Sequence, residues 1–233
     1  NVEKVLDITL NNGYDSKTGI LFKPTSKDIS LCQSTEEIYK EYQEMLVYFM
    51  DLQVITEHIN DEIHVMQDIN AFRASLIEDC IGRGLDLVEG GSVYSADGGP
   101  TAGTISSGDA LAAIDDIVFK KKIISLDQLL HALKTNFEDD TTIPAGHEIR
   151  VALLNKAPKF GNDDDAADEW VVRLENFIGS RYRNEYKSSK YGKGPVPCCY
   201  SYSQSPVTGN IAFGKCIGAT PDGRKDGYPV NNG

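Results

Sequence analysis

The sequence predicts an α/β protein in which helices dominate. An apolar stripe between residues 38 and 66 predicts a single long helix. Strands are expected only at residues 88–95 and 197–205, where glycines or prolines bound apolar residues. Further helices are expected at residues 73–81, 104–120, 125–137 and 147–155 and around Trp170. A few strands separated by helices in this order are typical of an α/β layout with crossover helices.

Length, charge and cysteine content exclude several classes of protein. The 233 residues are enough for one large domain or two small ones with a buried core. A formal net charge of −12 argues against nucleic-acid binding, which needs a basic surface. No apolar run is long enough to span a bilayer, and the start does not resemble a signal peptide. Five cysteines without a C-x-x-C zinc pattern indicate reduced thiols in a cytoplasm.

The first elements are a mixed apolar segment and the long helix. Residues 2–10 end at the turn signal Asn-Asn-Gly of residues 11–13. In the long helix, apolar residues recur every three or four positions, and Ser34 with Glu37 gives a capping box at its start. The Asn-Asp pair at residues 60–61 is a point at which this helix could divide in two.

Glycines separate the elements in the middle of the chain. The short helix at 73–81 is expected to stop at Gly82 and Gly84. The strand at 88–95 is followed by a loop at 98–103, which leads into the next helix.

Capping signals mark the later helices. Ser125 with Gln128 forms a capping box for a helix that runs to Phe137. The helix that carries Trp170 is expected to continue as far as Tyr186.

The Asn-Asp-Asp-Asp run at residues 162–165 allows two interpretations. Its oxygen atoms resemble a ligand set for a hard cation. However, adjacent side chains that enter a helix point in different directions, and the EF-hand spacing is absent. Capping of the Trp170 helix by Asn162 or Asp163 is therefore preferred, and no metal site is expected.

The glycine-rich segment at residues 90–103 is a candidate for a functional site. It lacks the Lys-Ser/Thr of a phosphate loop, and no G-x-G-x-x-G turn occurs in the chain. A strand, a flexible loop and a helix in this order are where α/β proteins build pockets. The candidate pocket residues are Glu89, Tyr94, Ser95 and Asp97. An ordinary strand–turn–helix connection is the alternative.

Two unusual strings carry a family resemblance. Residues 157–165 read APKFGNDDD, and residues 218–225 read GATPDGRK. Weaker strings occur in order at residues 4–6 with 11–13, at 79–84, at 89–91 with Tyr94, and at 109–114. In this order and spacing, the strings resemble the glycyl radical enzymes of the pyruvate formate-lyase type.

The resemblance implies a fold and a chemistry. It implies a ten-stranded α/β barrel made of two half-barrels with long outer helices, and residues 1–233 would be an internal segment of that single barrel domain. In this family, a separate iron–sulfur, S-adenosylmethionine-dependent activase installs a glycyl radical, and a cysteine then abstracts hydrogen from the substrate. The segment itself is expected to bind no cofactor. Oxygen destroys the radical, which implies a cytoplasmic location in an anaerobic organism.

The motifs for the cysteine and the radical glycine are not in this sequence. Neither a G-C-x-E-type nor an R-V-x-G-Y-type string occurs. Cys198 and Cys199 are adjacent, but no glutamate follows in the required arrangement, so they are interpreted as strand thiols. The chain is therefore interpreted as an inner segment of a larger enzyme that is inactive by itself.

The resemblance leaves several activities open. Residues 94–101 depart from the Tyr-Asn and Thr-Gly-Pro-Gln strings of glycerol and diol dehydratases. This departure favours the group that decarboxylates 4-hydroxyphenylacetate to p-cresol, in which Glu89 would accept the phenol proton. A glycerol or diol dehydratase is one alternative, and a non-catalytic truncated chain is another.

The resemblance also implies partners. These are the activating enzyme, the rest of the parent barrel, a small subunit and further copies of the same chain, with no nucleic acid and no membrane. A truncated barrel would expose apolar helix faces and open strand edges, so poor solubility or association is expected.

Overall fold

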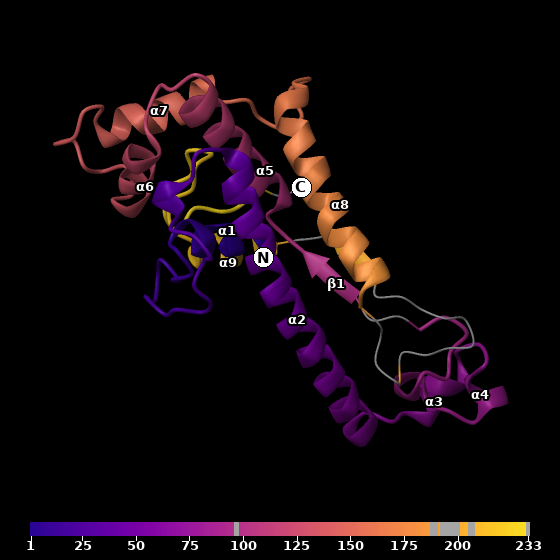
Figure 1. Ribbon diagram of the computed structural model, residues 1–233. Helices are drawn as coiled ribbons and strands as arrows, with labels where there is room; N and C mark the ends of the chain where they lie inside the picture. Colours follow the sequence, from indigo (N-terminus) through magenta and orange to yellow (C-terminus); the bar gives the residue numbers. More distant parts are fainter. Residues whose placement is uncertain (96–97, 187–190, 192–200, 205–207, 232–233) are drawn as a thin grey trace. The chain divides into compact units, whose positions relative to one another are not determined.

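The computed structural model describes residues 1–95, 98–186, 191, 201–204 and 208–231 (Figure 1). The α-helices are α1 (Val2–Leu10), α2 (Thr35–Gln67), α3 (Ala71–Ser75), α4 (Cys80–Arg83), α5 (Thr104–Ala113), α6 (Leu126–Lys134), α7 (Gly146–Lys156), α8 (Asp165–Asn184) and α9 (Gly209–Lys215). The other elements are the 3-10 helices η1 (Ile29–Leu31) and η2 (Leu87–Glu89), the π-helix η3 (Ile114–Lys120), and the strands β1 (Gly98–Thr101) and β2 (Ser201–Gln204).

The chain forms two compact units. The first contains residues 1–48, 101–175 and 204–233, and the second contains residues 49–100 and 176–203. The helices α2 and α8 each begin in the first unit and end in the second.

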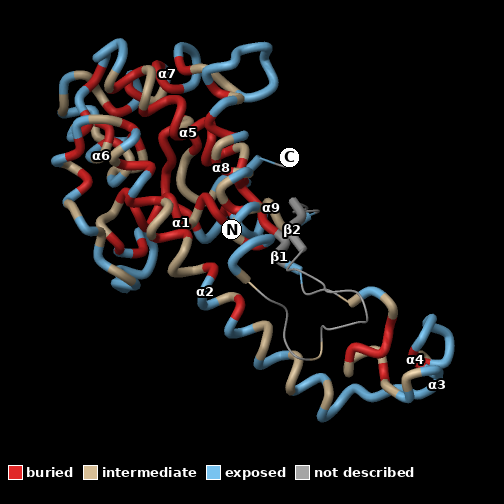
Figure 2. Tube along the Cα trace, turned by 45° about the vertical axis from the view of Figure 1, so that its right-hand side comes forward, coloured by how far each residue is buried: buried red, intermediate tan, exposed pale blue. Residues whose placement is uncertain are grey.

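The core of the first unit is built around α5. The helix α1 packs against α5, and η3 continues α5 and packs against α6 and α7. Leu6, Leu111 and Ile114 are fully buried in this core, and Figure 2 shows α5 in red along most of its length. A Cβ placed at Gly108 would lie 2.3 Å from Val171 Cγ2, so only glycine allows α8 to approach α5 this closely.

The predicted long helix is confirmed as α2. The backbone N–H of Glu37 donates to Ser34 Oγ at 3.3 Å, as expected for the cap. The helix continues through residues 60–61 without a break. The capping box of Ser125 and Gln128 is also confirmed, since each side chain bonds the backbone N–H of the other at the start of α6.

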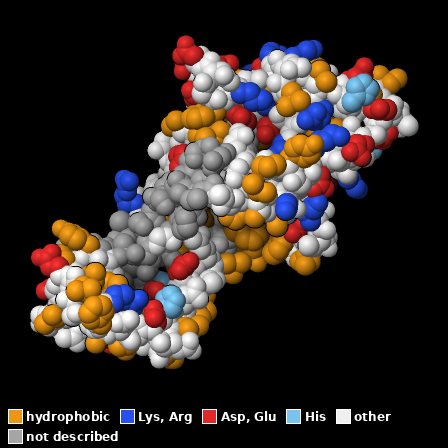
Figure 3. Space-filling model, turned by 180° about the vertical axis from the view of Figure 1, so that it is seen from behind, with side chains coloured by type: hydrophobic (Ala, Val, Ile, Leu, Met, Phe, Trp, Pro, Cys, Tyr) orange, Lys and Arg blue, Asp and Glu red, His pale blue; other side chains and the backbone are white. Residues whose placement is uncertain are grey.

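The apolar stripe of α2 is buried in one unit and exposed in the other. Ile38 and Tyr42 are fully buried in the first unit, whereas Ile59 is 55% and Met66 is 78% exposed in the second. Figure 3 shows further exposed hydrophobic side chains at the end of the second unit that holds α3 and α4. The exposed residues there are Ile69, Phe72, Leu76 and Ile81. Exposed apolar faces of this kind are the feature expected from the family resemblance.

Tyrosines connect α2 and α8 within the second unit. Tyr182 Oη donates to Gln53 Oε1 at 2.7 Å, and Tyr186 Oη bonds Asp51. Burial raises the pKa of both phenols to about 12.

The predicted helix at 73–81 is wrong in its extent. It is replaced by the short helices α3 and α4, with a break between Ser75 and Cys80. Asp79 has a left-handed backbone (φ 77°), and a residue in that conformation interrupts a right-handed helix.

The predicted strand at 88–95 is also wrong. Residues 87–89 form η2, and Gly90 follows with a left-handed backbone (φ 76°). Arg83 Nη1 donates to the carbonyls of Gly90, Gly91 and Ser92, which are the acceptors that a partner strand would need. The strand β1 lies instead at residues 98–101, where a loop is expected from the sequence.

The described residues contain one two-stranded sheet, in which β1 pairs with β2. The strand β2 covers residues 201–204 of the predicted strand at 197–205, and Cys198 and Cys199 lie outside the described residues. The described chain is therefore mostly helical, and its place in a ten-stranded barrel remains a prediction.

The cap of α8 differs from the prediction by one or two residues. The helix begins at Asp165, and Asp164 Oδ1 accepts the backbone N–H of Ala166 at 3.0 Å. Asp163 instead has a left-handed backbone (φ 56°) in the preceding turn. Asp164 is therefore the capping residue, in place of Asn162 or Asp163.

Among the described helices, none combines the length and apolar character that would be needed to cross a membrane. Within the same residues, no three His, Cys, Asp or Glu side chains converge as metal ligands.

Candidate functional site

The two strings that carry the resemblance meet in the first unit. Lys159 Nζ donates to the carbonyl of Asp222 at 2.8 Å, and Arg150 Nε of α7 donates to the carbonyl of Gly223 at 3.0 Å. Asp109 of α5 accepts the backbone N–H of Phe160 at 2.7 Å. Segments about 50 to 70 residues apart in the sequence are thus joined by charged side chains that bond backbone groups.

Arg224 holds the loop of residues 218–228 in its conformation. Its guanidinium group is buried and donates to the carbonyls of Gly218, Lys225 and Tyr228. Its Nε atom lies 3.2 Å from Thr220 Oγ1. Four partners for one buried side chain fix the loop, because each lost bond would leave a buried carbonyl or hydroxyl unpaired.

Glu3 of α1 lies beside this arginine. Its side chain is fully buried, and Oε1 is 3.7 Å from Arg224 Nε. Among the described residues, neither carboxylate oxygen accepts a well-formed hydrogen bond, although the hydroxyls of Ser106 and Thr220 face the group. Burial and, to a smaller extent, the negative charge of Asp222 together raise the pKa of Glu3 to about 8, against the opposing effect of Arg224. Glu3 is therefore mostly protonated at neutral pH.

Asp109 is a second buried acid in this region. It is 5% exposed, and burial raises its pKa. The N–H of Phe160 and the ammonium group of Lys159 oppose that rise. The carboxylate thus depends on the string at residues 157–165 for its compensation.

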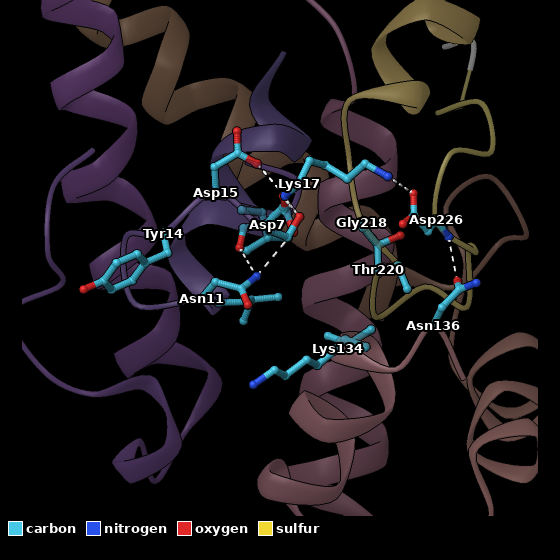
Figure 4. A pocket seen from close by; sticks show the side chains of 15 residues that line it. Asp7, Asn11, Tyr14, Asp15, Lys17, Lys134, Asn136, Gly218, Thr220 and Asp226 are labelled. Carbon is cyan, nitrogen blue, oxygen red and sulfur yellow. Dashed lines mark hydrogen bonds and ion pairs between the residues drawn. The ribbon is translucent and has the colours of Figure 1, made fainter. Parts of the chain in front are cut away.

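A polar pocket opens next to the 218–228 loop (Figure 4). Its volume is about 370 Å³, and three segments form its walls: the end of α1 with the loop that follows, the end of α6, and residues 218–226. The lining residues are Leu6, Asp7, Leu10, Asn11, Tyr14, Asp15, Ser16, Lys17, Leu133, Lys134, Asn136, Gly218, Ala219, Thr220 and Asp226. This volume lies in the range of small-molecule sites.

Ion pairs organise the pocket wall. Lys4 Nζ bridges Asp7 and Asp15 at 2.8 and 2.6 Å, and Lys17 pairs with Asp226. The hydrogen bonds from Lys4 and the Lys17 backbone lower the pKa of Asp15 against the opposing effect of burial.

Comparison with known proteins places these features in a family. The model of the pyruvate formate lyase-like family matches residues 1–214. The chain belongs to this family. The predicted resemblance to glycyl radical enzymes is thereby confirmed.

Individual relatives match the chain along nearly all of its length. A trans-4-hydroxy-L-proline dehydratase of Clostridioides difficile is 34% identical over 238 residues, which cover 100% of this chain and 28% of the relative. A 4-hydroxyphenylacetate decarboxylase glycyl radical subunit of the same species (strain CD196) is 26% identical over 249 residues, covering 99% of this chain and 26% of the relative.

A solved structure concerned with 1,2-propanediol dehydration in Roseburia inulinivorans superimposes with a TM-score of 0.90 and 30% identity. The superposition covers 100% of this chain and 28% of the chain in that structure. The chain thus spans between a quarter and a third of the length of these glycyl radical enzymes.

The structure places three of the four predicted site residues, Glu89, Tyr94 and Ser95, in the second unit. Glu89 lines a mostly apolar pocket of about 300 Å³ with Ile81, Leu85 and Cys80. Its Oε2 atom accepts the backbone N–H of Asp86 at 2.9 Å, so the carboxylate forms the second half of a capping box for η2. Its role as a proton acceptor remains a prediction.

Two of the other predicted pocket residues, Tyr94 and Ser95, do not join Glu89. Tyr94 is 77% exposed, and neither Tyr94 nor Ser95 lines the pocket that contains Glu89. Asp97 lies outside the described residues.

The buried acids Glu3 and Asp109 were not among the residues predicted from the sequence to form a site. Glu3 lies directly before the string that starts at Lys4, and Asp109 begins the string at 109–114. Position in or next to these strings is the signal that would have indicated the two acids, because the sequence itself carries no measure of burial.

Proposed function

We propose that this chain is the positioning segment of a glycyl radical lyase that removes water from a small hydroxylated substrate. The observation that carries the proposal is the difference in identity across the same residues, 34% with the hydroxyproline dehydratase against 26% with the decarboxylase subunit. Decarboxylation, the activity preferred from the sequence, is therefore the less favoured of the two.

The segment's own contribution would be structural support for the reacting groups. The bonds of Lys159 and Arg150 to the 218–228 loop, and of Asp109 to Phe160, fix loops against α5 and α7. Rigid supports of this kind matter in an enzyme, because displacement of a reacting group by about 1 Å can lower the rate about a hundredfold. The glycyl radical of the family would come from elsewhere in a longer chain, after activation by the iron–sulfur, S-adenosylmethionine-dependent enzyme.

A second candidate is the decarboxylation of 4-hydroxyphenylacetate. It is favoured by the position of Glu89 at the edge of a pocket lined largely by apolar side chains, which would suit an aromatic ring. A non-catalytic role is the remaining alternative for residues 1–233 by themselves. The location would be an anaerobic cytoplasm, and the partners would be the activating enzyme and, in the oligomer, further copies of the chain.

The proposal is tested by replacing the matching segment of the hydroxyproline dehydratase with residues 1–233. The chimera is activated without oxygen and supplied separately with trans-4-hydroxy-L-proline, 1,2-propanediol, glycerol and 4-hydroxyphenylacetate. Loss of water from one of the first three supports the proposal. Formation of p-cresol alone favours the second candidate.

A radical signal in electron paramagnetic resonance provides the folding control. A chimera that shows the glycyl radical but converts none of the hydroxylated compounds contradicts the dehydratase proposal. Residues 1–233 alone serve as the negative control and are expected to give no radical signal.

A further inference from the structure

The pocket beside the 218–228 loop is lined by both negative and positive side chains. The acids are Asp7, Asp15 and Asp226, and the cations are Lys17, which pairs with Asp226, and Lys134. Figure 4 shows the side chain of Lys134 extending away from the Lys17–Asp226 pair. Lys134 and the acids come from different elements, since Lys134 ends α6 and the acids lie on α1 and in loops.

Lys134 is the cation that has no charged partner here. Lys4 is held by Asp7 and Asp15, and Lys17 is held by Asp226. Within the described part of the chain, no ion pair or hydrogen bond involves the Lys134 ammonium group. It can therefore accept an anionic group of a ligand without giving up a contact in the protein.

The acidic side retains unused acceptor capacity. Asp7 Oδ2 accepts Lys4 and Ser16, whereas Asp7 Oδ1 receives only a long 3.4 Å contact from the Asn11 amide. Asp226 Oδ1 accepts Lys17 Nζ, and its second oxygen has no donor among the residues that the structure describes. A carboxylate has room for about four hydrogen bonds, so both acids can accept a further N–H donor.

Gly218 keeps this part of the pocket open. A Cβ at this position would lie 2.9 Å from Ser16 Oγ and 3.4 Å from Asp7 Oδ1. Between the charged ends, Leu6, Leu10 and Ala219 provide a buried apolar floor. Such a floor suits a short hydrocarbon chain.

We propose that this pocket binds a small amino acid as a zwitterion, with its carboxylate on Lys134 and its ammonium group on Asp7 and Asp226. The charges around the pocket balance when Lys4, which pairs with Asp7 and Asp15, is counted with Lys17 and Lys134 against the three acids. A zwitterion matches this arrangement, whereas a simple anion or cation would leave one side unmatched. The site is separate from the predicted pocket around Glu89, and it does not depend on the proposed dehydration.

The test is isothermal titration calorimetry, in which the 233-residue chain is titrated separately with glycine, β-alanine and 4-aminobutyrate. Acetate and methylammonium are titrated in parallel as the two half-ligands. At least one amino acid is expected to bind with a Kd below about 1 mM, and each half-ligand at least tenfold more weakly. Acetate binding as tightly as the amino acids would overturn the proposal, and so would no binding up to about 10 mM.

Variants locate the site. Lys134→Gln and Asp226→Asn are each expected to weaken binding about tenfold. Lys40→Gln, an exposed lysine of α2 outside the pocket, is the matched control and leaves the Kd unchanged. Unchanged binding by Lys134→Gln contradicts the proposal.

A measurement on the chain without any substitution covers the case in which a variant fails to fold. Acetylation by acetic anhydride is followed by mass spectrometry with and without the best-binding amino acid. Protection of Lys134 relative to Lys40 is expected, and equal labelling of the two lysines with ligand present would overturn the assignment.

Discussion

The carboxylate of Glu3 lies 3.7 Å from the guanidinium group of Arg224, with both side chains buried. The pair joins the first helix to a loop more than 200 residues later in the chain. Arg224 is fully occupied by backbone carbonyls and a hydroxyl, whereas Glu3 has no comparable set of partners. The two residues thus share a location but differ in how well their charges are compensated.

Glu3→Gln is expected to stabilise the chain at neutral and higher pH. The pKa of Glu3 is about 8 in the fold against an ordinary 4.5, so the folded state holds the proton more tightly between these pH values. The free energy of unfolding therefore falls as pH rises from about 4.5 to about 8. The glutamine removes this fall and adds roughly 1–3 kcal/mol near pH 8.

Denaturant unfolding at pH 5 and pH 8 measures this effect. Glu78 is exposed, so Glu78→Gln is the control and should change the free energy of unfolding at neither pH. An equal effect of Glu3→Gln at both pH values would show that Glu3 does not titrate in this range.

Arg224→Lys is expected to destabilise the first unit by roughly 3 kcal/mol. Lysine cannot reproduce the planar fork that reaches the carbonyls of Gly218 and Tyr228, and a buried acceptor left unpaired costs about 1–3 kcal/mol. Chemical denaturation measures the change, and the exposed Arg183→Lys should have little effect.

A double-mutant cycle with Glu3→Gln separates the two roles of Arg224. Because Glu3 is mostly protonated at pH 7, the coupling energy should be below about 1 kcal/mol. A much larger coupling would mean that the charge pair, and not the carbonyl bonds, determines the effect of Arg224.

Gly108→Ala is expected to destabilise the chain by about 1–3 kcal/mol, although alanine is the better helix former. The new Cβ would lie 2.3 Å from Val171 Cγ2, so α5 and α8 would have to separate. Val171→Ala combined with Gly108→Ala should recover much of the loss.

Gly82→Ala in α4 is the matched control for this prediction. Its nearest atom, Asp79 Oδ1, would lie 3.6 Å from the new Cβ, which is an ordinary contact. This change should stabilise by about 0.5–1 kcal/mol. Thermal unfolding of both variants makes the comparison, and similar effects would contradict close packing at Gly108.

Substitutions at two isoleucines of α2 should differ in their effect on stability. Ile38→Ala is expected to cost about 2–5 kcal/mol because Ile38 is fully buried, whereas Ile59→Lys should have little effect on stability because Ile59 is 55% exposed. Ile59→Lys should instead reduce association, which sedimentation velocity measures. Unchanged association would show that this face of α2 does not mediate it.

Local patterns in the sequence were sufficient to predict most helices. Ser125 with Gln128 and the apolar spacing of α2 act over a few residues, so they can be recognised without a tertiary structure. The strand prediction at 88–95 failed because Arg83 and the left-handed Gly90 hold these residues in a turn. Those constraints come from folding of the chain around them and leave no periodic pattern.

The sequence by itself determined the family, through the order of its unusual strings, and it determined the positions of the main helices. Only the tertiary structure decided that Glu3 is buried beside Arg224, that Lys159 reaches Asp222, and that only the first part of the α2 stripe is buried. Burial, pKa and charge pairing depend on which distant segments meet, because desolvation and Coulomb energies are set by distance in space and not by separation along the chain.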